Sequence, residues 1–203
     1  MKNLSEILVA TTNKGKIREF EDLLCGFGLR FRGLSEFPHI TEVAENGQTF
    51  AENAALKACG YARQTGLPTL ADDSGLEVAA LNNAPGIFSA RFGGIGLSDA
   101  QRVEKLLADL ENIGLEERQA RFVCVIALAN ENGEIYYSAT GICNGRIAAN
   151  PLGTNGFGYD PIFVPDGYEN TFGELQPSIK HKISHRAHAV NEIIRFLQDF
   201  LQN

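Results

Sequence analysis

The sequence lacks the cysteine and hydrophobic patterns of secreted, zinc-binding and membrane proteins. Its four cysteines lie far apart and form no CxxC pair, so the spacings of a zinc site and of a disulfide framework are both absent. We interpret them as reduced, mostly buried thiols. The apolar run in MKNLSEILVA is too short for a signal peptide, and no later segment approaches the roughly 18 unbroken apolar residues of a membrane span. These absences predict a cytoplasmic protein without a membrane partner.

An excess of positive charge is also absent. The chain has 18 Lys and Arg against 25 Asp and Glu, a net charge of -7 and a pI near 5.1. Proteins whose main partner is nucleic acid usually carry a basic face, so we expect no nucleic-acid partner. A small anionic ligand stays possible wherever Lys and Arg gather locally.

The pattern of apolar residues predicts one domain spanning residues 1–203, because 44% hydrophobic content is ample for a sizeable core. The expected strands cover residues 6–11, 67–71, 120–129 and 134–143, the last two joined by the Asn-Gly turn of NENG. The expected helices begin at Lys16, Thr49, Ser98 and near the SHR of residues 184–186. This order predicts an α/β fold with a mixed central sheet flanked by helices.

The stretch ATTNKGKIRE, residues 10–19, joins the first expected strand to the first expected helix. A helix N-terminus offers unpaired N–H groups and the positive end of the helix dipole, so this turn could cradle a phosphate. The Walker pattern, GxxxxGK followed by Ser or Thr, is not met. On this stretch alone, an ordinary turn capped by Asn13 or Thr12 is favoured. The candidate phosphate contacts are Thr11, Thr12, Asn13, Lys14, Gly15 and Lys16.

Two adjacent carboxylates, Asp72 and Asp73, follow the apolar run of residues 67–71 in LADDSGLEV. Neighbouring side chains on a strand point to opposite faces, so both can serve one site only if the chain begins to turn, which Ser74 and Gly75 make plausible. One carboxylate on a hard cation and one near a water would suit magnesium-assisted attack at phosphorus. A solvated acidic turn is the alternative.

Two further charged residues carry weak signals when each is taken alone. Glu45 lies in the loop before the second expected helix and is typical of solvated surface. Lys57 lies on that helix beside alanines, where its aliphatic stem can pack while its amine stays in solvent.

The loop NGFGYDP, residues 155–161, combines aromatics and glycines. Phe157 and Tyr159 could hold a flat ligand, glycines such as Gly158 let the backbone approach it, and Asp160 could accept from ring or ribose donors. The alternative is a tight connection whose two aromatics lie in the core.

The segment KHKISHRAHA, residues 180–189, concentrates positive charge in an acidic protein. Its histidines lack the spacing and the additional ligands of a zinc site. A cationic segment that enters a helix suits a phosphate or a purine carbonyl, and a solvated basic turn is the alternative.

Six stretches in a fixed order resemble the inosine triphosphate pyrophosphatase family: ATTNKGKIRE, ENGQTFAENAALKA, LADDSGLEV, APGIFSARFGG, GFGYDPIF and SHRAHA. Together they extend over nearly the whole chain. The resemblance implies Mg²⁺-dependent hydrolysis of dITP, ITP and XTP to the nucleoside monophosphate and pyrophosphate. It also implies a homodimer whose subunits have two lobes around a deep substrate cleft.

The resemblance also implies roles for matching residues. Asp73 matches the catalytic carboxylate, and the metal ligands match Glu45, Asp72 and Asp73. The phosphate-binding loop matches residues 11–16, with Lys57 and Ser74 as further phosphate contacts. The base-holding loop matches Phe157, Gly158, Tyr159 and Asp160, and the purine-reading group matches Lys180, His185 and Arg186. We expect Asp73 to serve the water and the metal, with Asp72 in support.

Base selectivity has a simple physical form in this hypothesis. Hypoxanthine and xanthine present a carbonyl at position 6, so donors of Arg186 or His185 aimed there would meet the adenine amino group donor to donor. Two alternatives stay open. One is a nucleotide pyrophosphatase with another base preference, for example for modified pyrimidines, and the other is a non-catalytic nucleotide-binding module.

Overall fold

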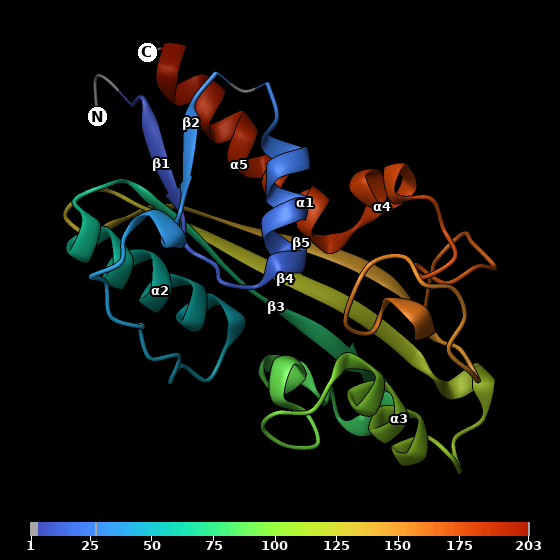
Figure 1. The fold of residues 1–203 in the computed structure, drawn as a ribbon. Helices are drawn as coiled ribbons and strands as arrows, with labels where there is room; N and C mark the ends of the chain where they lie inside the picture. The colour runs from blue at the N-terminus through green and yellow to red at the C-terminus, as the bar shows by residue number, and fades with distance from the viewer. Residues whose placement is uncertain (1–3, 27, 203) are drawn as a thin grey trace. The chain divides into compact units, whose positions relative to one another are not determined.

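The computed structural model describes residues 4–26 and 28–202 and contains a mixed sheet with the strand order β2-β1-β3-β4-β5-β6 (Figure 1). β1 pairs in parallel with β2 and with β3, while β5 and β6 are antiparallel. The strands are β1 Glu6–Val9, β2 Arg30–Gly33, β3 Thr69–Val78, β4 Gln119–Ala129, β5 Ile135–Ile147 and β6 Phe163–Pro165. The helices are α1 Lys14–Leu24, α2 Phe50–Thr65, α3 Asp99–Asp109, α4 Pro177–Ile183 and α5 His185–Gln202. The predicted α/β class with a mixed sheet is confirmed.

The chain divides into two compact units, and the long strands β3, β4 and β5 each pass from one to the other. The first unit contains the described residues up to Asp73, residues 124–141 and those from Arg186 onward. The second contains residues 74–123 and 142–185. The expected single domain with a cleft between two lobes stays a prediction.

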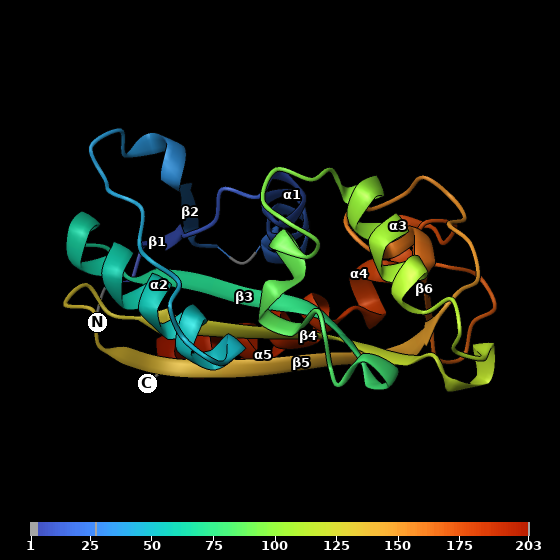
Figure 2. The same ribbon diagram turned by 90° about the horizontal axis from the view of Figure 1, so that it is seen from below.

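The first unit has a core in which α1 and α5 pack against strands of the sheet (Figure 2). Its buried side chains include Phe20 and Leu24 of α1, Val190, Ile193 and Leu197 of α5, and Ile7, Leu70 and Ile126 of the strands. α2 instead buries a row of alanines, Ala54, Ala58 and Ala62, which have no exposed surface. Their four-residue spacing places them on one face of α2, and their small size suits a close approach to neighbouring backbone.

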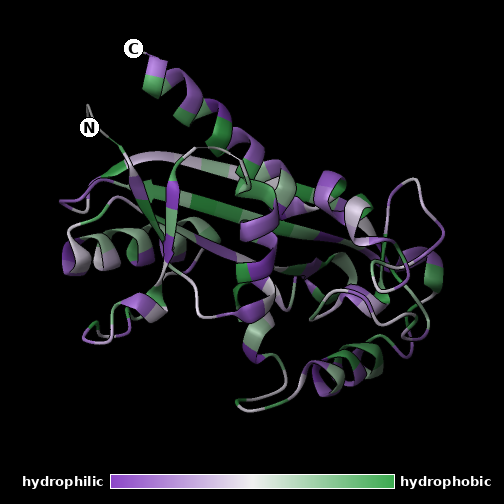
Figure 3. Cartoon of the chain, turned by 45° about the horizontal axis from the view of Figure 1, so that its top comes forward, coloured by the Kyte–Doolittle hydropathy of each residue, from purple (hydrophilic) through white to green (hydrophobic). Residues whose placement is uncertain are grey.

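The second unit has its own core around α3 and the phenylalanines of β4, β6 and the following loop. Phe122 lies with its ring centroid 4.6 Å from that of Phe163 and 6.4 Å from that of Phe172, and Val103 and Leu106 of α3 belong to the same cluster. Figure 3 shows that apolar residues predominate in the central strands, while apolar and polar residues alternate along the helices. β4 is buried continuously from Phe122 to Ala129, as expected for a strand covered on both faces.

Several elements differ from the sequence prediction. The expected strand of residues 67–71 continues to Val78, so Asp72 and Asp73 lie inside β3 and the predicted turn at Ser74 is wrong. The strands β2 and β6 and the helix α4 were not predicted, although Pro177 at the first turn of α4 is a common helix-start signal. The capping at Thr49 and Ser98 is confirmed, since each hydroxyl accepts from the N–H three residues on.

The structure also tests the predictions about the cysteines and about membrane-spanning segments. All four cysteines are free thiols, of which Cys124 and Cys143 are buried, whereas Cys25 is exposed, so the expectation of mostly buried thiols is only half right. Across residues 4–26 and 28–202, every helix is too short or too polar to cross a membrane.

Candidate active site

The loop after β1 is arranged as an N-cap for α1. The Asn13 Oδ1 accepts from the N–H groups of Gly15 and Lys16, at 2.9 and 3.1 Å, and the Thr11 hydroxyl accepts from the Asn13 N–H at 3.2 Å. Thr12 and Lys14 are exposed. The capped turn that we favoured from the stretch alone is therefore present, and its binding of phosphate stays a prediction.

A cavity of about 1010 Å³ in the first unit borders this loop. Its lining includes Thr11, Thr12 and Lys14 together with apolar side chains of α1 and β2, among them Phe20 and Phe31. The volume lies at the upper end of the range of small-molecule sites, roughly 300–1,000 Å³. The loop is therefore accessible to a ligand from this side.

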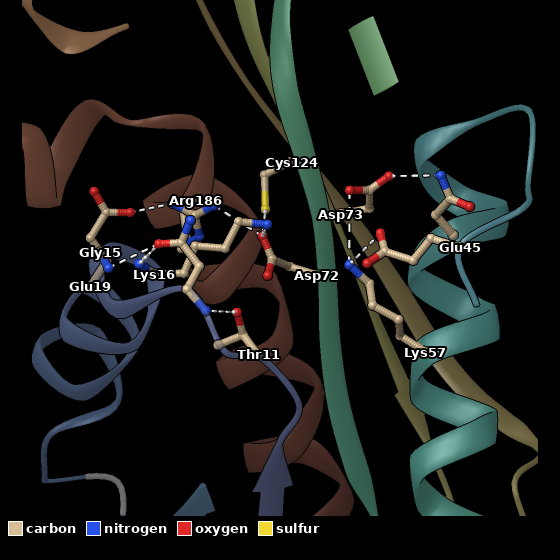
Figure 4. A network of polar contacts seen from close by, with 12 residues as sticks. Thr11, Gly15, Lys16, Glu19, Glu45, Lys57, Asp72, Asp73, Cys124 and Arg186 are labelled. Carbon is tan, nitrogen blue, oxygen red and sulfur yellow. Dashed lines mark hydrogen bonds and ion pairs between the residues drawn. The ribbon is translucent and has the colours of Figure 1, made fainter. Parts of the chain in front are cut away.

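Asp72 lies in a buried network of charges on one side of β3 (Figure 4). Its Oδ2 is 2.9 Å from both the Lys16 Nζ and the Arg186 Nη2, and Arg186 also donates through Nη1 to the carboxylate of Glu19. The Asp72 side chain is fully buried. Burial alone would raise the pKa of Asp72, but the charges of Lys16 and Arg186 outweigh it and hold this pKa far below its ordinary value.

Asp73 lies on the other side of the same strand, beside α2 (Figure 4). The Asn53 Nδ2 donates to its Oδ2 at 3.1 Å, and the Lys57 Nζ lies 3.9 Å from its Oδ1 and 3.0 Å from the Glu45 Oε2. Burial raises the pKa of Asp73, and the negative charge of Glu45 adds to this, against the lowering effects of Lys57, Lys16 and Asn53. The net shift of this pKa is upward.

Lys57 is the cation shared by the two carboxylates of this side. Its burial lowers its pKa, but the charges of Asp72, Asp73 and Glu45 prevail, so the pKa of Lys57 is raised and the ammonium form is retained. The harmless surface position that we considered for Lys57 is therefore wrong, because its side chain is only 11% exposed and lies between two acids. Glu45 likewise has a specific partner.

The second unit brings together three of the residues predicted to hold or read a base. The Lys180 Nζ lies 2.6 Å from the Asp160 Oδ2, which also accepts from the Phe157 N–H at 2.8 Å. The same amine lies 4.7 Å from the centre of the Phe157 ring, a distance at which a cation is attracted to an aromatic face. Phe157, Asp160 and Lys180 thus form one contact group.

Three other residues predicted to hold or read the base contact residues outside this group. Tyr159 is buried in the core of the second unit and donates its hydroxyl to the Ser89 carbonyl at 2.8 Å, so the core alternative holds for this aromatic. The Gly158 N–H donates to Asp99 at 2.8 Å, and the His185 ring stacks on Phe122 with a centroid distance of 4.7 Å. Ser74, which was predicted as a phosphate contact, is half-buried within β3.

The sequence prediction missed three residues of the two networks: Glu19, Asn53 and Cys124. Glu19 lies three residues after Lys16, and Asn53 lies four residues before Lys57, so each shares a helix face with a residue that was predicted. That spacing is a signal from which both could have been found. The Cys124 thiol, 3.9 Å from the Asp72 Oδ2, comes from β4, and no local pattern points to it.

No cluster of three or more His, Cys, Asp or Glu side chains within the described ranges is placed to hold a metal ion. Mg²⁺ is usually bound through one or two carboxylates together with substrate phosphates and water. The pair of Glu45 and Asp73, gathered around Lys57, has the oxygen donors that such a substrate-borne ion requires. Asp72 belongs to the network of Lys16 and Arg186 instead.

Comparisons with known proteins agree over nearly the whole chain. A sequence model of the Ham1 family matches residues 7–196. A Bacillus cereus protein named dITP/XTP pyrophosphatase is 44% identical over 194 residues, which cover 95% of each chain. The structure of a HAM1 protein from Coxiella burnetii superposes with a TM-score of 0.88 at 45% identity, covering 96% of this chain and 99% of that one. The Staphylococcus aureus Ham1 protein gives a TM-score of 0.85 at 42% identity with the same coverage.

Proposed function

Because the chain belongs to the Ham1 family, we propose that it hydrolyses the non-standard purine nucleotides dITP, ITP and XTP to a nucleoside monophosphate and pyrophosphate. Relatives named dITP/XTP pyrophosphatase support this substrate class. The chemistry is assigned from one observation, namely that the pKa of Asp72 is lowered while that of Asp73 is raised. When the surroundings of two titratable groups shift their pKa values in opposite directions, the two groups usually have different roles in acid–base catalysis.

In this mechanism Asp73 is the general base. A carboxylate whose pKa is raised above its ordinary value binds a proton more readily, which suits a general base. The water gives its proton to Asp73, its oxygen forms a bond to phosphorus, and the anhydride bond between the α- and β-phosphates breaks. Pyrophosphate leaves with the electron pair of that bond, and no covalent intermediate with the enzyme forms.

The positive charges hold the triphosphate. Lys57, beside Asp73, and Lys16, held by Asp72, are each largely buried, at 11% and 13% exposure of their side chains. A buried cation interacts with phosphate more strongly than one in water, because the local dielectric constant is lower. The exposed residues Thr12, Asn13 and Lys14 and the half-buried Thr11 and Gly15 complete the proposed phosphate contacts, with Ser74 as a further one.

We propose Mg²⁺ as the cofactor, held by Glu45 and Asp73. When bound with the substrate, the ion neutralises charge on the phosphates and so lowers the barrier to attack. Asp72, which we expected as a third ligand, is proposed to support the site by fixing Lys16 and Arg186, because its carboxylate contacts those two cations.

The purine is proposed to bind at Phe157–Asp160, with its carbonyl at position 6 read by donors of Lys180 and of either His185 or Arg186. Lys180 is already held by Asp160, and the Arg186 guanidinium is held by Glu19 and Asp72. The Lys180 ammonium and the Arg186 guanidinium can only donate, so neither can accept from an adenine amino group, which supports discrimination against ATP.

We further propose that the enzyme is a cytoplasmic homodimer that acts on free nucleotides rather than on nucleic acid or at a membrane. The net charge of -7 supports the exclusion of nucleic acid.

The decisive experiment measures Mg²⁺-dependent release of pyrophosphate from ITP, dITP and XTP, with ATP, GTP and modified pyrimidine triphosphates as comparisons. Preference for a pyrimidine would favour the alternative base specificity. No release from any nucleotide, with binding retained, would favour the non-catalytic module.

A further inference from the structure

We propose that Asn53 is a positioning residue that holds Asp73 and the loop carrying Glu45 in one arrangement. The inference rests on the proposed function in one respect, namely that Asp73 and Glu45 act on the substrate. Asn53 is 1% exposed and lies on α2 four residues before Lys57.

The Asn53 amide makes two hydrogen bonds of opposite kind. Its Nδ2 donates to the Asp73 Oδ2 at 3.1 Å, and its Oδ1 accepts from the Gly47 N–H at 2.8 Å. A carboxylate accepts and a backbone N–H donates, so the two partners together fix which way the amide points. The Asn amide can donate and accept at the same time, whereas an ionised Asp of the same size can only accept.

The loop of residues 41–48 runs along α2 and is attached to it at four successive places. The bonds are Thr41 to Gln64, Val43 to Tyr61, Gly47 to Asn53 and Gln48 to Glu52. Glu45 lies between the second and third of these attachments. Asn53 also contacts Asp73, so it links the position of the loop to that of the proposed base.

The packing around Gly47 shows how closely the loop approaches this amide. A Cβ added at Gly47 would lie 2.8 Å from the Asn53 Oδ1 and 2.7 Å from the Glu52 Cβ, closer than ordinary van der Waals contact. With this contact in place, the Glu45 and Asp73 carboxylates both lie near the Lys57 Nζ, at 3.0 and 3.9 Å. Displacement of a reacting group by about 1 Å can lower a rate by about a hundredfold.

Two substitutions separate the two bonds. Asn53→Ala removes both, whereas Asn53→Asp keeps an acceptor for the Gly47 N–H and places a negative charge against Asp73. Glu52→Ala is the matched control, because it removes the neighbouring bond to the Gln48 N–H without touching Asp73. For each variant we would measure kcat and KM for ITP, the folded fraction by thermal unfolding, and the exchange of the Gly47 and Gln48 amide protons by NMR.

We expect Asn53→Ala to lower kcat by about tenfold or more with KM within about threefold, and to speed exchange at Gly47. Asn53→Asp should lower kcat similarly while the Gly47 exchange stays near that of the wild type. Glu52→Ala should speed exchange at Gln48 and leave kcat within about twofold. The inference is overturned if both Asn53 variants keep kcat within that range, if Glu52→Ala loses as much, or if the loss vanishes after correction for the folded fraction.

The amide exchange keeps this test distinct from that of the proposed function. If Asp73→Asn kept full turnover, the assignment of Asp73 as the base would fail, while fast Gly47 exchange in Asn53→Ala would still support the link to the loop. Wild-type exchange at Gly47 in Asn53→Ala would overturn the inference alone.

Discussion

Asp72 and Asp73 are neighbours on β3, yet one faces α1 and α5 and the other faces α2 (Figure 4). On the first side, two cations contact one buried carboxylate, and the pKa of Asp72 falls. On the second side, two carboxylates share one cation, and the pKa of Asp73 rises. The balance of charge differs between the sides, and this difference supports the proposed roles of Asp72 in support and of Asp73 in proton transfer.

The largest expected effect is that of Asp73→Asn on turnover. The amide keeps the size of the side chain but cannot accept the proton of water, so kcat for ITP should fall by about 10²- to 10⁴-fold. Binding of ITP, measured by calorimetry, should be retained. Stopped or continuous detection of pyrophosphate gives the rate, and an unchanged rate would remove Asp73 from the chemistry.

Asp72→Asn should affect stability more than Asp73→Asn does. It leaves Lys16 and Arg186 without the carboxylate that both contact, and breaking a buried ion pair in this way costs about 3–5 kcal/mol. Urea unfolding of the two variants beside the wild type measures the difference. Equal losses of unfolding free energy in both variants would contradict the contrast between the two sides of β3.

The same pair of variants should respond oppositely to pH. Because the folded pKa of Asp72 is lowered, its stabilisation is fully present above the unfolded pKa of about 3.9 and is lost as the pH falls below it. Because the folded pKa of Asp73 is raised, its ionisation costs stability, and this cost grows as the pH rises from about 3.9 through the folded pKa. Unfolding free energies at a series of pH values, each relative to the Asn variant, check both signs.

Removal of each lysine tests, through the pH dependence of kcat, how strongly its charge lowers the pKa of Asp73. Lys57 lowers the pKa of Asp73 more than Lys16 does, so Lys57→Met should move the acidic limb of the kcat profile to higher pH by more than Lys16→Met. The shift is measured from kcat for ITP at a series of pH values between about 4 and 9, at about 25 °C. A larger shift in the Lys16 variant would reverse the assignment of the two lysines.

The smallest effect is expected at Cys124. Its thiol is buried, and burial raises its pKa to about 12, so it stays protonated and makes only a weak contact with Asp72 at 3.9 Å. Cys124→Ala should lower the free energy of unfolding by about 1 kcal/mol and leave kcat almost unchanged. Thermal unfolding and pyrophosphate release test this, and a large loss of turnover would place Cys124 in the site.

Local patterns predicted the elements that hold the site better than they predicted its contacts. The helix from Thr49 to Gly66 was expected from its cap and its apolar spacing, and α2 ends at Gly66 with a positive φ of 67°, a conformation that glycine adopts easily. The continuation of β3 through Asp72 and Asp73 was not expected. Two acids before Ser-Gly favour a turn unless cations from other elements compensate their burial, and the sequence of β3 contains no information about those cations.

The α/β alternation, the capped helices and the identity of the charged residues follow from local sequence, because apolar periodicity and capping act over a few neighbouring positions. The contacts of Lys16 and Arg186 with Asp72, and of Asn53 and Lys57 with Asp73, arise only when the chain is folded. Asn53 lies 20 residues from Asp73 along the chain, and Arg186 lies 114 residues from Asp72. Their pairing depends on which helix covers which face of β3, and that choice is made by packing of the whole unit.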